Sequence, residues 1–223
     1  MIRLPLLLLI FVLLGACSNA LRWTPDYHTV RSGETLYTIA LSYNLDTRDL
    51  ANWNGLGDGT YIRTGQKLRL TPGDSSQQSA TRKNAGSGKR VTVSKQPVLP
   101  APAWRWPAAG KVLYRFGYSV KSQSGIRIGG DEGEAVRSTS AGEVVYAGSG
   151  LKSYGQLIIV KHNDTWLSAY GFNKALLVKE GTRVSAGQKI ATMGKTTDGK
   201  VMLHFEIRKN GQPVDPQRYL PKR

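Results

Sequence analysis

The sequence predicts two small folded domains: an N-terminal α+β module of β-α-α-β order and an all-β sandwich at the C-terminus. With 40% hydrophobic and 9% aromatic residues, the 223-residue chain can bury one or two cores, so wholesale disorder is excluded. Its 25 glycines, 10 prolines and 21% charged residues are typical of short strands joined by turns, not of long helices.

The start of the chain indicates an export signal. An apolar run at 4–16 follows Arg3 and is too short to cross about 30 Å of hydrocarbon as a helix. It ends in Leu14-Gly15-Ala16-Cys17, which resembles the bacterial lipobox, whose cysteine is lipidated and becomes the first residue of the mature chain. We expect a signal peptide at 1–16 and a lipidated tether at 17–26; an ordinary secretory signal is the alternative.

The expected lipid on Cys17 places the protein on a membrane of the cell envelope. Cys17 is also the single cysteine, which excludes an intramolecular disulfide and any multi-cysteine zinc site. Ser18 differs from the aspartate that similar lipoproteins use to stay in the inner membrane, which favours the outer membrane with the protein facing the periplasm. A net charge of +16 would suggest nucleic acid, but export excludes that partner.

Most of the excess positive charge lies in the last domain, where residues 104–223 hold nineteen basic and nine acidic residues. Such a surface attracts anionic envelope polymers or an acidic protein face, or is simply a solvated basic surface. Before it, residues 72–103 contain no aromatic residue and are rich in Pro, Ser and Lys. This composition cannot offset the entropy of ordering, so we expect a flexible linker that tethers two separate modules.

Residues 27–71 read as strand, helix, helix and strand. Alternation over 27–30 predicts the first strand, in which His28 is expected to be half-exposed. Apolar residues at helical spacing predict two helices, the second capped by Asp46 and ended by Asn54-Gly55. Gly65-Gln-Lys-Leu-Arg-Leu predicts the last strand, with Leu68 and Leu70 on one face.

These elements carry the motifs Tyr-x-Val-x-x-Gly-Glu-Thr-Leu, Asn52-x-Asn54-Gly-Leu and Gly-Gln-x-Leu, and the module resembles LysM over its whole length. The resemblance implies binding of peptidoglycan glycan strands containing N-acetylglucosamine in a shallow groove. Carried over by position, the glycan-binding residues are Gly33, Glu34, Thr35, Leu36, Tyr61 and Ile62. Leu36 also fits a core position and Thr35 a helix N-cap. Tyr61 is the best single candidate to stack on a sugar, and a plain loop tyrosine is the alternative.

From Trp104 onward the sequence predicts short strands at turn-marked intervals and no helix of ten residues. The expected strands are 111–114, 125–128, 135–138, 143–147, 157–162, 167–172, 189–193 and 201–208. Alternation in the last strand places Leu203, Phe205 and Ile207 on a core face and residues 202, 204, 206 and 208 on the other. An all-β, partly open sandwich follows.

Seven ordered motifs in residues 104–223 resemble the lysostaphin-like (LytM) zinc peptidases. They include Trp-x-Trp-Pro-x-x-Gly-x-Val, Gly142-x-Val-Val-Tyr-Ala-Gly, Gly187-Gln-Lys-Ile-Ala-x-Met-Gly and Leu-His-Phe-Glu-Ile-Arg. The resemblance implies a β-sandwich that hydrolyses peptidoglycan cross-bridges with a zinc held by His-x-Gly-x-Asp and by the second His of His-x-His, assisted by further histidines.

This sequence departs from that pattern at four positions. Gln123-Ser-Gly125-Ile-Arg127 stands in place of His-x-Gly-x-Asp, Phe172 replaces an assisting histidine, and Met202 replaces the first His of His-x-His. Only His204 survives, whereas a catalytic zinc needs about three protein ligands. We therefore expect no metal, no cofactor, no catalytic residue and no enzymatic activity, and we do not expect His162 and Asp164 to rebuild the site.

A degenerate peptidase domain joined to a LysM module and a lipobox is similar to the NlpD-like murein hydrolase activators. The resemblance implies a non-catalytic activator of periplasmic zinc N-acetylmuramoyl-L-alanine amidases that promotes septal peptidoglycan cleavage. The expected partner-binding groove consists of Gln123, Arg127, Tyr154, Phe172, Met202 and His204. Two alternatives stay open: a lipid-anchored peptidoglycan tether without an enzyme partner, and a residual peptidoglycan endopeptidase.

Overall fold

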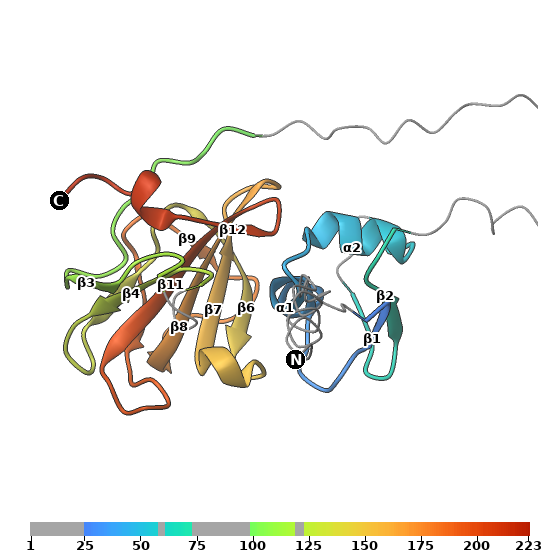
Figure 1. The fold of residues 1–223 in the computed structure, drawn as a ribbon, viewed down its shortest axis with the longest axis horizontal. Coiled ribbons are helices and arrows are strands. Elements are labelled where there is room, and N and C mark those ends of the chain that lie inside the picture. The colour runs from blue at the N-terminus through green and yellow to red at the C-terminus, as the bar shows by residue number, and fades with distance from the viewer. Residues whose placement is uncertain (1–24, 58–60, 73–98, 119–122) are drawn as a thin grey trace, which may run out of the picture.

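The computed structural model describes residues 25–57, 61–72, 99–118 and 123–223. The expected signal peptide, Cys17 and most of the linker lie outside these residues. The described parts form a small α+β module and a larger β domain (Figure 1). In the described part of the chain, no helix is long and apolar enough to span a membrane.

The N-terminal module has the expected β-α-α-β order. It consists of β1 (Tyr27–Thr29), α1 (Leu36–Tyr43), α2 (Thr47–Trp53) and β2 (Lys67–Arg69), with β1 and β2 antiparallel. Thr35 caps α1 through a capping box with Thr38, and the Asp46 side chain accepts a hydrogen bond from the backbone N–H of Arg48 at the start of α2. These local signals explain why the sequence predicted both helices.

The apolar faces of the module close on one another. Its core contains Val30, Leu36, Ile39, Ala40, Leu50, Ala51, Leu68 and Leu70. The expectation of a half-exposed His28 was wrong, because His28 is buried and its Nε2 lies 2.7 Å from Glu34 Oε2. Its Nδ1 lies 3.1 Å from the Tyr43 hydroxyl, so the ring joins the first strand to the following loop and to α1.

The C-terminal domain is built from antiparallel strands with no α-helix among its described residues. The strands are β3 (Val112–Tyr114), β4 (Ile126–Gly129), β5 (Ala135–Arg137), β6 (Gly142–Gly148), β7 (Gln156–Lys161), β8 (Trp166–Leu176), β9 (Arg183–Val184), β10 (Lys189–Met193), β11 (Met202–Lys209) and β12 (Gln212–Val214). They form a sheet of order β3-β4-β11-β8-β7-β6-β9, while β10 pairs with β5 and β8, and β12 pairs with β11. All eight expected strands are present, and β9 and β12 are additional.

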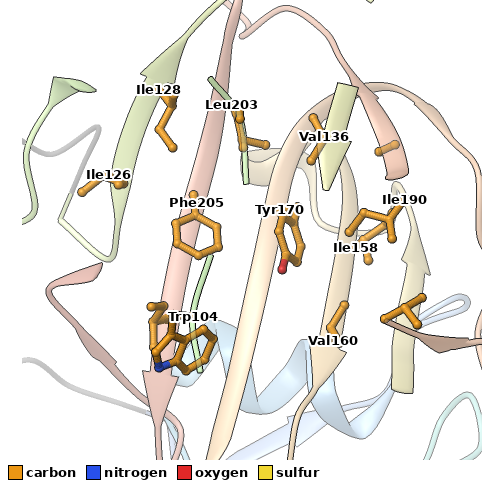
Figure 2. Close-up of a cluster of buried hydrophobic side chains, with 14 of the residues drawn as sticks. Trp104, Ile126, Ile128, Val136, Ile158, Val160, Tyr170, Ile190, Leu203 and Phe205 are labelled. Carbon is orange, nitrogen blue, oxygen red and sulfur yellow. The ribbon is translucent and has the colours of Figure 1, made fainter. Parts of the chain in front are cut away.

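The core lies on one face of this sheet. Figure 2 shows Ile126, Ile128, Tyr170, Leu203 and Phe205 pointing into it from β4, β8 and β11. The expected core face of β11 is confirmed, because Leu203, Phe205 and Ile207 are fully buried. The opposite face of β11 is buried as well, which alternation alone does not predict.

That opposite face is covered partly by the N-terminal module, so the two modules are not merely tethered, as the linker had suggested. Leu41 of α1 packs in one apolar cluster with Tyr146, Leu157, Ile159 and Ala169 of the sheet. Figure 1 shows α1 beside β6. The expected linker also extends too far, because the backbone N–H of Leu99 already donates to Thr165 Oγ1 at 2.9 Å.

Candidate functional site

A groove lies on the sheet face opposite the core, at the end of β4, β11 and β8 where the peptidase-like motifs meet. It encloses a cavity of about 160 Å³. Its lining residues are Tyr114, Arg127, Ser153, Phe172, Thr196, Thr197, Asp198, Lys200 and Met202. Three of the six residues expected in the partner-binding groove therefore line it directly: Arg127, Phe172 and Met202.

Strand register explains how these residues meet. On β11, His204 pairs with Arg127 of β4 on one side and with Gly171 of β8 on the other. Met202 lies two residues before His204 and therefore projects from the same face. The positions at which the related peptidases hold zinc are thus neighbours here, although they carry different side chains.

Arg127 and Phe172 form the wall of the groove. The guanidinium carbon of Arg127 lies 4.6 Å from the centre of the Phe172 ring, a cation–π contact. Burial lowers the pKa of Arg127, and the negative charge of Glu206 opposes that shift. An arginine titrates so far above neutrality that Arg127 nevertheless keeps its positive charge at pH 7.

The backbone of Phe172 is strained. Its φ is 60°, in the left-handed region that an aromatic residue adopts only when the surrounding structure enforces it. Phe172 is 6 % exposed, and its ring centroid lies 6.5 Å from that of His204. Phe172 therefore lines the groove and is also packed against the protein interior.

Below the groove, the floor is a buried hydrogen-bond network centred on Glu206. Its Oε1 accepts from Ser124 Oγ at 2.6 Å, Tyr154 Oη at 2.9 Å and His204 Nε2 at 2.7 Å. Its Oε2 accepts from Arg208 Nε at 2.7 Å. Glu206 is fully buried and Arg208 is 1 % exposed, so this ion pair is almost free of solvent.

The network fixes the protonation states of its members. Burial alone would raise the pKa of Glu206, but Arg208 and the hydrogen bond from His204 outweigh it and hold that pKa well below its usual range. Burial lowers the pKa of His204 and raises that of Tyr154. At neutral pH the floor therefore contains an ionised Glu206, a neutral His204 and a protonated Tyr154.

A neutral His204 that donates from Nε2 keeps a lone pair on Nδ1. This nitrogen is buried and finds no hydrogen-bond partner among the described residues. A histidine held by a carboxylate through one nitrogen and open at the other has the arrangement of a metal ligand. His204 therefore keeps the geometry of a metal ligand, with Glu206 orienting its ring through Nε2.

The rest of the donor set does not fit zinc. The neighbouring positions carry the cation of Arg127, the ring of Phe172 and the thioether of Met202, none of which is a zinc ligand. Among the described residues, no three His, Cys, Asp or Glu side chains come close enough together to hold a metal ion. No catalytic step through a metal follows from this arrangement.

The other sequence-predicted groove residues are placed differently. Tyr154 and His204 belong to the floor, with their ring centroids 5.4 Å apart. Gln123 is exposed and does not line the cavity. The sequence did not predict that the loop between β10 and β11 (Thr196, Thr197, Asp198 and Lys200) lines the groove. The dipeptide Asp198-Gly199 indicates a turn, but it does not indicate which side chains the turn brings to the groove.

The cation bonded to Glu206 is Arg208, which the alternation of β11 places on the same face. His162 is held by two contacts: Nδ1 lies 2.8 Å from the Ala141 carbonyl and Nε2 lies 2.8 Å from Ser168 Oγ. Asp164 pairs with Lys161 at 2.7 Å.

The expected glycan-binding residues of the N-terminal module differ in their exposure and in the contacts they make. Leu36 is fully buried in the core and Thr35 forms the helix cap, so neither offers a free side chain. Glu34 bonds to His28, and Gly33 adopts the positive φ of 80°. Tyr61 is 83 % exposed, whereas Ile62 packs partly on the core.

Comparisons with known proteins agree with these two domains. The LysM domain family matches residues 28–71, and peptidase family M23 matches residues 121–216. The chain is 39% identical to the lipoprotein NlpD/LppB homolog of Pseudomonas aeruginosa, over 94% of this chain and 82% of that protein.

Two relatives from Escherichia coli strain K12 are also similar over most of the chain. The uncharacterized lipoprotein YgeR is 36% identical, over 97% of this chain and 91% of the relative. The murein hydrolase activator NlpD is 36% identical, over 88% of this chain and 68% of the relative. With both domains matched in order and three relatives aligned along nearly the whole chain, the protein belongs to the NlpD family of LysM- and M23-domain lipoproteins.

Proposed function

We propose that this protein is a non-catalytic activator of periplasmic N-acetylmuramoyl-L-alanine amidases. In this proposal a lipid on Cys17 anchors it to the outer membrane, the LysM module binds peptidoglycan glycan strands, and the degenerate M23 domain binds the amidase. Septal peptidoglycan is then cleaved during cell division by the partner enzyme.

One observation carries the proposal: positions that bind zinc or assist catalysis in the related peptidases lie together here, but they now carry Arg127, Phe172 and Met202. Arginine, aromatic residues and methionine are enriched at the centres of protein interfaces. The name of the E. coli relative, murein hydrolase activator, supports the same function.

The chemistry of the groove indicates what the partner offers. Among the described lining residues, Arg127 and Lys200 contribute positive charge and Asp198 contributes a carboxylate, while the wall is apolar at Phe172 and Met202. The best-fitting partner segment therefore combines an acidic side chain with apolar neighbours. Activation follows by population shift, because a groove that binds only the open amidase raises the share of that state.

The experiment that tests this function compares three activities of the mature chain. Co-purification with a zinc amidase, together with stimulated release of peptidoglycan fragments by that amidase, is the expected result. Peptidoglycan binding without any amidase partner would instead support a tether. A cleared band in a zymogram of the chain alone would support a residual endopeptidase and contradict the proposal.

A further inference from the structure

The two modules meet at two turns. The β11–β12 turn contains Asn210 and Gly211, both with positive φ (48° and 72°), as a tight Asn-Gly hairpin requires. It lies against the turn between α1 and α2 of the LysM module. Arg48 Nη2 donates to Asn210 Oδ1 at 3.4 Å, and the Gln212 side-chain amide donates to the Asn44 carbonyl.

The backbones approach very closely at this point. A Cβ atom added to Gly211 would lie 2.0 Å from the carbonyl oxygen of Leu45 and 2.5 Å from the backbone nitrogen of Asp46. Only glycine fits between the turns. A side chain at position 211 is therefore incompatible with the docked LysM module.

An apolar contact accompanies the turns. Leu41 of α1 is 4 % exposed because it packs on Tyr146, Leu157 and Ile159, which project from the face of the sheet opposite the core. If the LysM module left, these side chains would face water, which opposes detachment. Docking is thus favoured by apolar burial as well as by polar contacts.

The docked module touches the network below the groove. Arg208 Nη1 donates to Asn44 Oδ1 of the LysM module at 3.1 Å and to the Gly211 carbonyl at 2.9 Å. The same guanidinium holds Glu206, which holds Tyr154 and His204. His204 and Arg208 are four residues apart on β11, about 13 Å along one strand.

We propose that the docked LysM module holds the groove in its partner-binding form, so that detaching the module lowers the affinity of the groove for the amidase. This inference rests on the proposed function of the groove. Detachment would hydrate Arg208 and weaken its electrostatic hold on Glu206. Glu206 would then hold the rings of Tyr154 and His204 less firmly, and the groove would be less preorganised for its partner.

A pair of matched glycine variants in the full chain tests this. Gly211→Ala introduces the methyl group that clashes with Leu45, whereas Gly181→Ala places alanine at a similar φ of 79° with no heavy atom within 4 Å. Both variants place alanine at a positive φ and carry a similar backbone cost, so only the first should detach the module. Small-angle scattering should show a larger radius of gyration for Gly211→Ala alone.

The amidase that responds to the parent chain is then titrated into each variant. We expect Gly211→Ala to bind it about fivefold or more weakly, the lower end of measured coupling between sites, while Gly181→Ala binds as the parent does. Unchanged scattering in Gly211→Ala would overturn the docked arrangement. If the module is detached in Gly211→Ala and the variant still binds the amidase as tightly as the parent or more tightly, the coupling is overturned.

A third variant, Arg127→Gln in the groove, separates this inference from the proposed function. If Arg127→Gln loses amidase binding and a detached Gly211→Ala does not, only the coupling fails. If neither variant changes amidase binding, the groove is not the docking site, and the part of the proposed function that assigns amidase binding to the groove fails.

Discussion

Glu206→Gln tests whether the floor network carries stability. The substitution keeps the size of the side chain and removes its charge. Glu206 is fully buried and bonded to Arg208, which is itself 1 % exposed. Replacing the carboxylate therefore leaves a buried guanidinium without its countercharge.

Breaking a buried ion pair by removing one partner typically costs about 3–5 kcal/mol. The remaining amide oxygen can still accept from Tyr154 and His204, but the amide nitrogen now faces the Nε–H of Arg208, donor against donor. We expect the free energy of unfolding to fall by about 3 kcal/mol, the lower end of that range.

The pH dependence has a defined sign. Because the pKa of Glu206 is held below its usual range, its contribution is complete above the unfolded value of about 4.3 and is lost as pH falls through the folded value. The difference between parent and variant should therefore be the same at pH 6 and pH 8.

Urea denaturation followed by circular dichroism measures this difference. The matched control is Glu132→Gln, whose carboxylate pairs with Lys174 and Lys195 at the surface and should change stability little. A loss of less than about 1 kcal/mol in Glu206→Gln would refute the reasoning, because it would mean that Arg208 is solvated or paired elsewhere.

Three further predictions concern metal, pH and glycan. Metal analysis of the mature chain should find far less than one zinc per chain, and Arg127→Asp should not restore binding because two ligands fall short of three; stoichiometric zinc would contradict this. Burial lowers the pKa of His162 to about 4. Against about 6.5 in the unfolded chain, this makes the unfolded state bind more protons, so stability should fall by about 2 kcal/mol from pH 7 to pH 5. His162→Gln should remove that part of the slope, and an unchanged slope would show that His162 stays accessible. Tyr61→Ala should weaken sedimentation with peptidoglycan without changing the unfolding transition, since Tyr61 is 83 % exposed; parent-like sedimentation would make Tyr61 a plain loop residue.

Local signals explain what the sequence could predict of the fold. Thr35 and Asp46 cap the two helices, and Gly55, with a φ of 64°, follows the second. Turn-marked intervals located all eight expected strands of the C-terminal domain, and alternation identified the core face of the last one. The two-residue β9 is too short to show a pattern, although the Asn210-Gly211 dipeptide before β12 is a hairpin signal that could have been used.

The site was predictable only in part. Motif positions identified Arg127, Phe172 and Met202 because the family register is kept. Which cation pairs with Glu206 depends on side-chain placement beneath the groove, which motif positions do not determine. The docking of the LysM module depends on Leu41 meeting an apolar sheet face, and helical periodicity cannot distinguish such an interface residue from a core residue.

Release of dye from labelled peptidoglycan by a purified amidase, with and without this protein, tests the central claim most directly. The account predicts no release by the protein alone, strong stimulation of the amidase by the parent chain, and none by Arg127→Gln or Phe172→Gly, the latter removing the ring without backbone strain. Arg183→Gln on β9, at the opposite end of the sheet order from the groove, is the matched control and should stimulate fully. Folded Arg127→Gln and Phe172→Gly variants that stimulate as strongly as the parent would contradict the account.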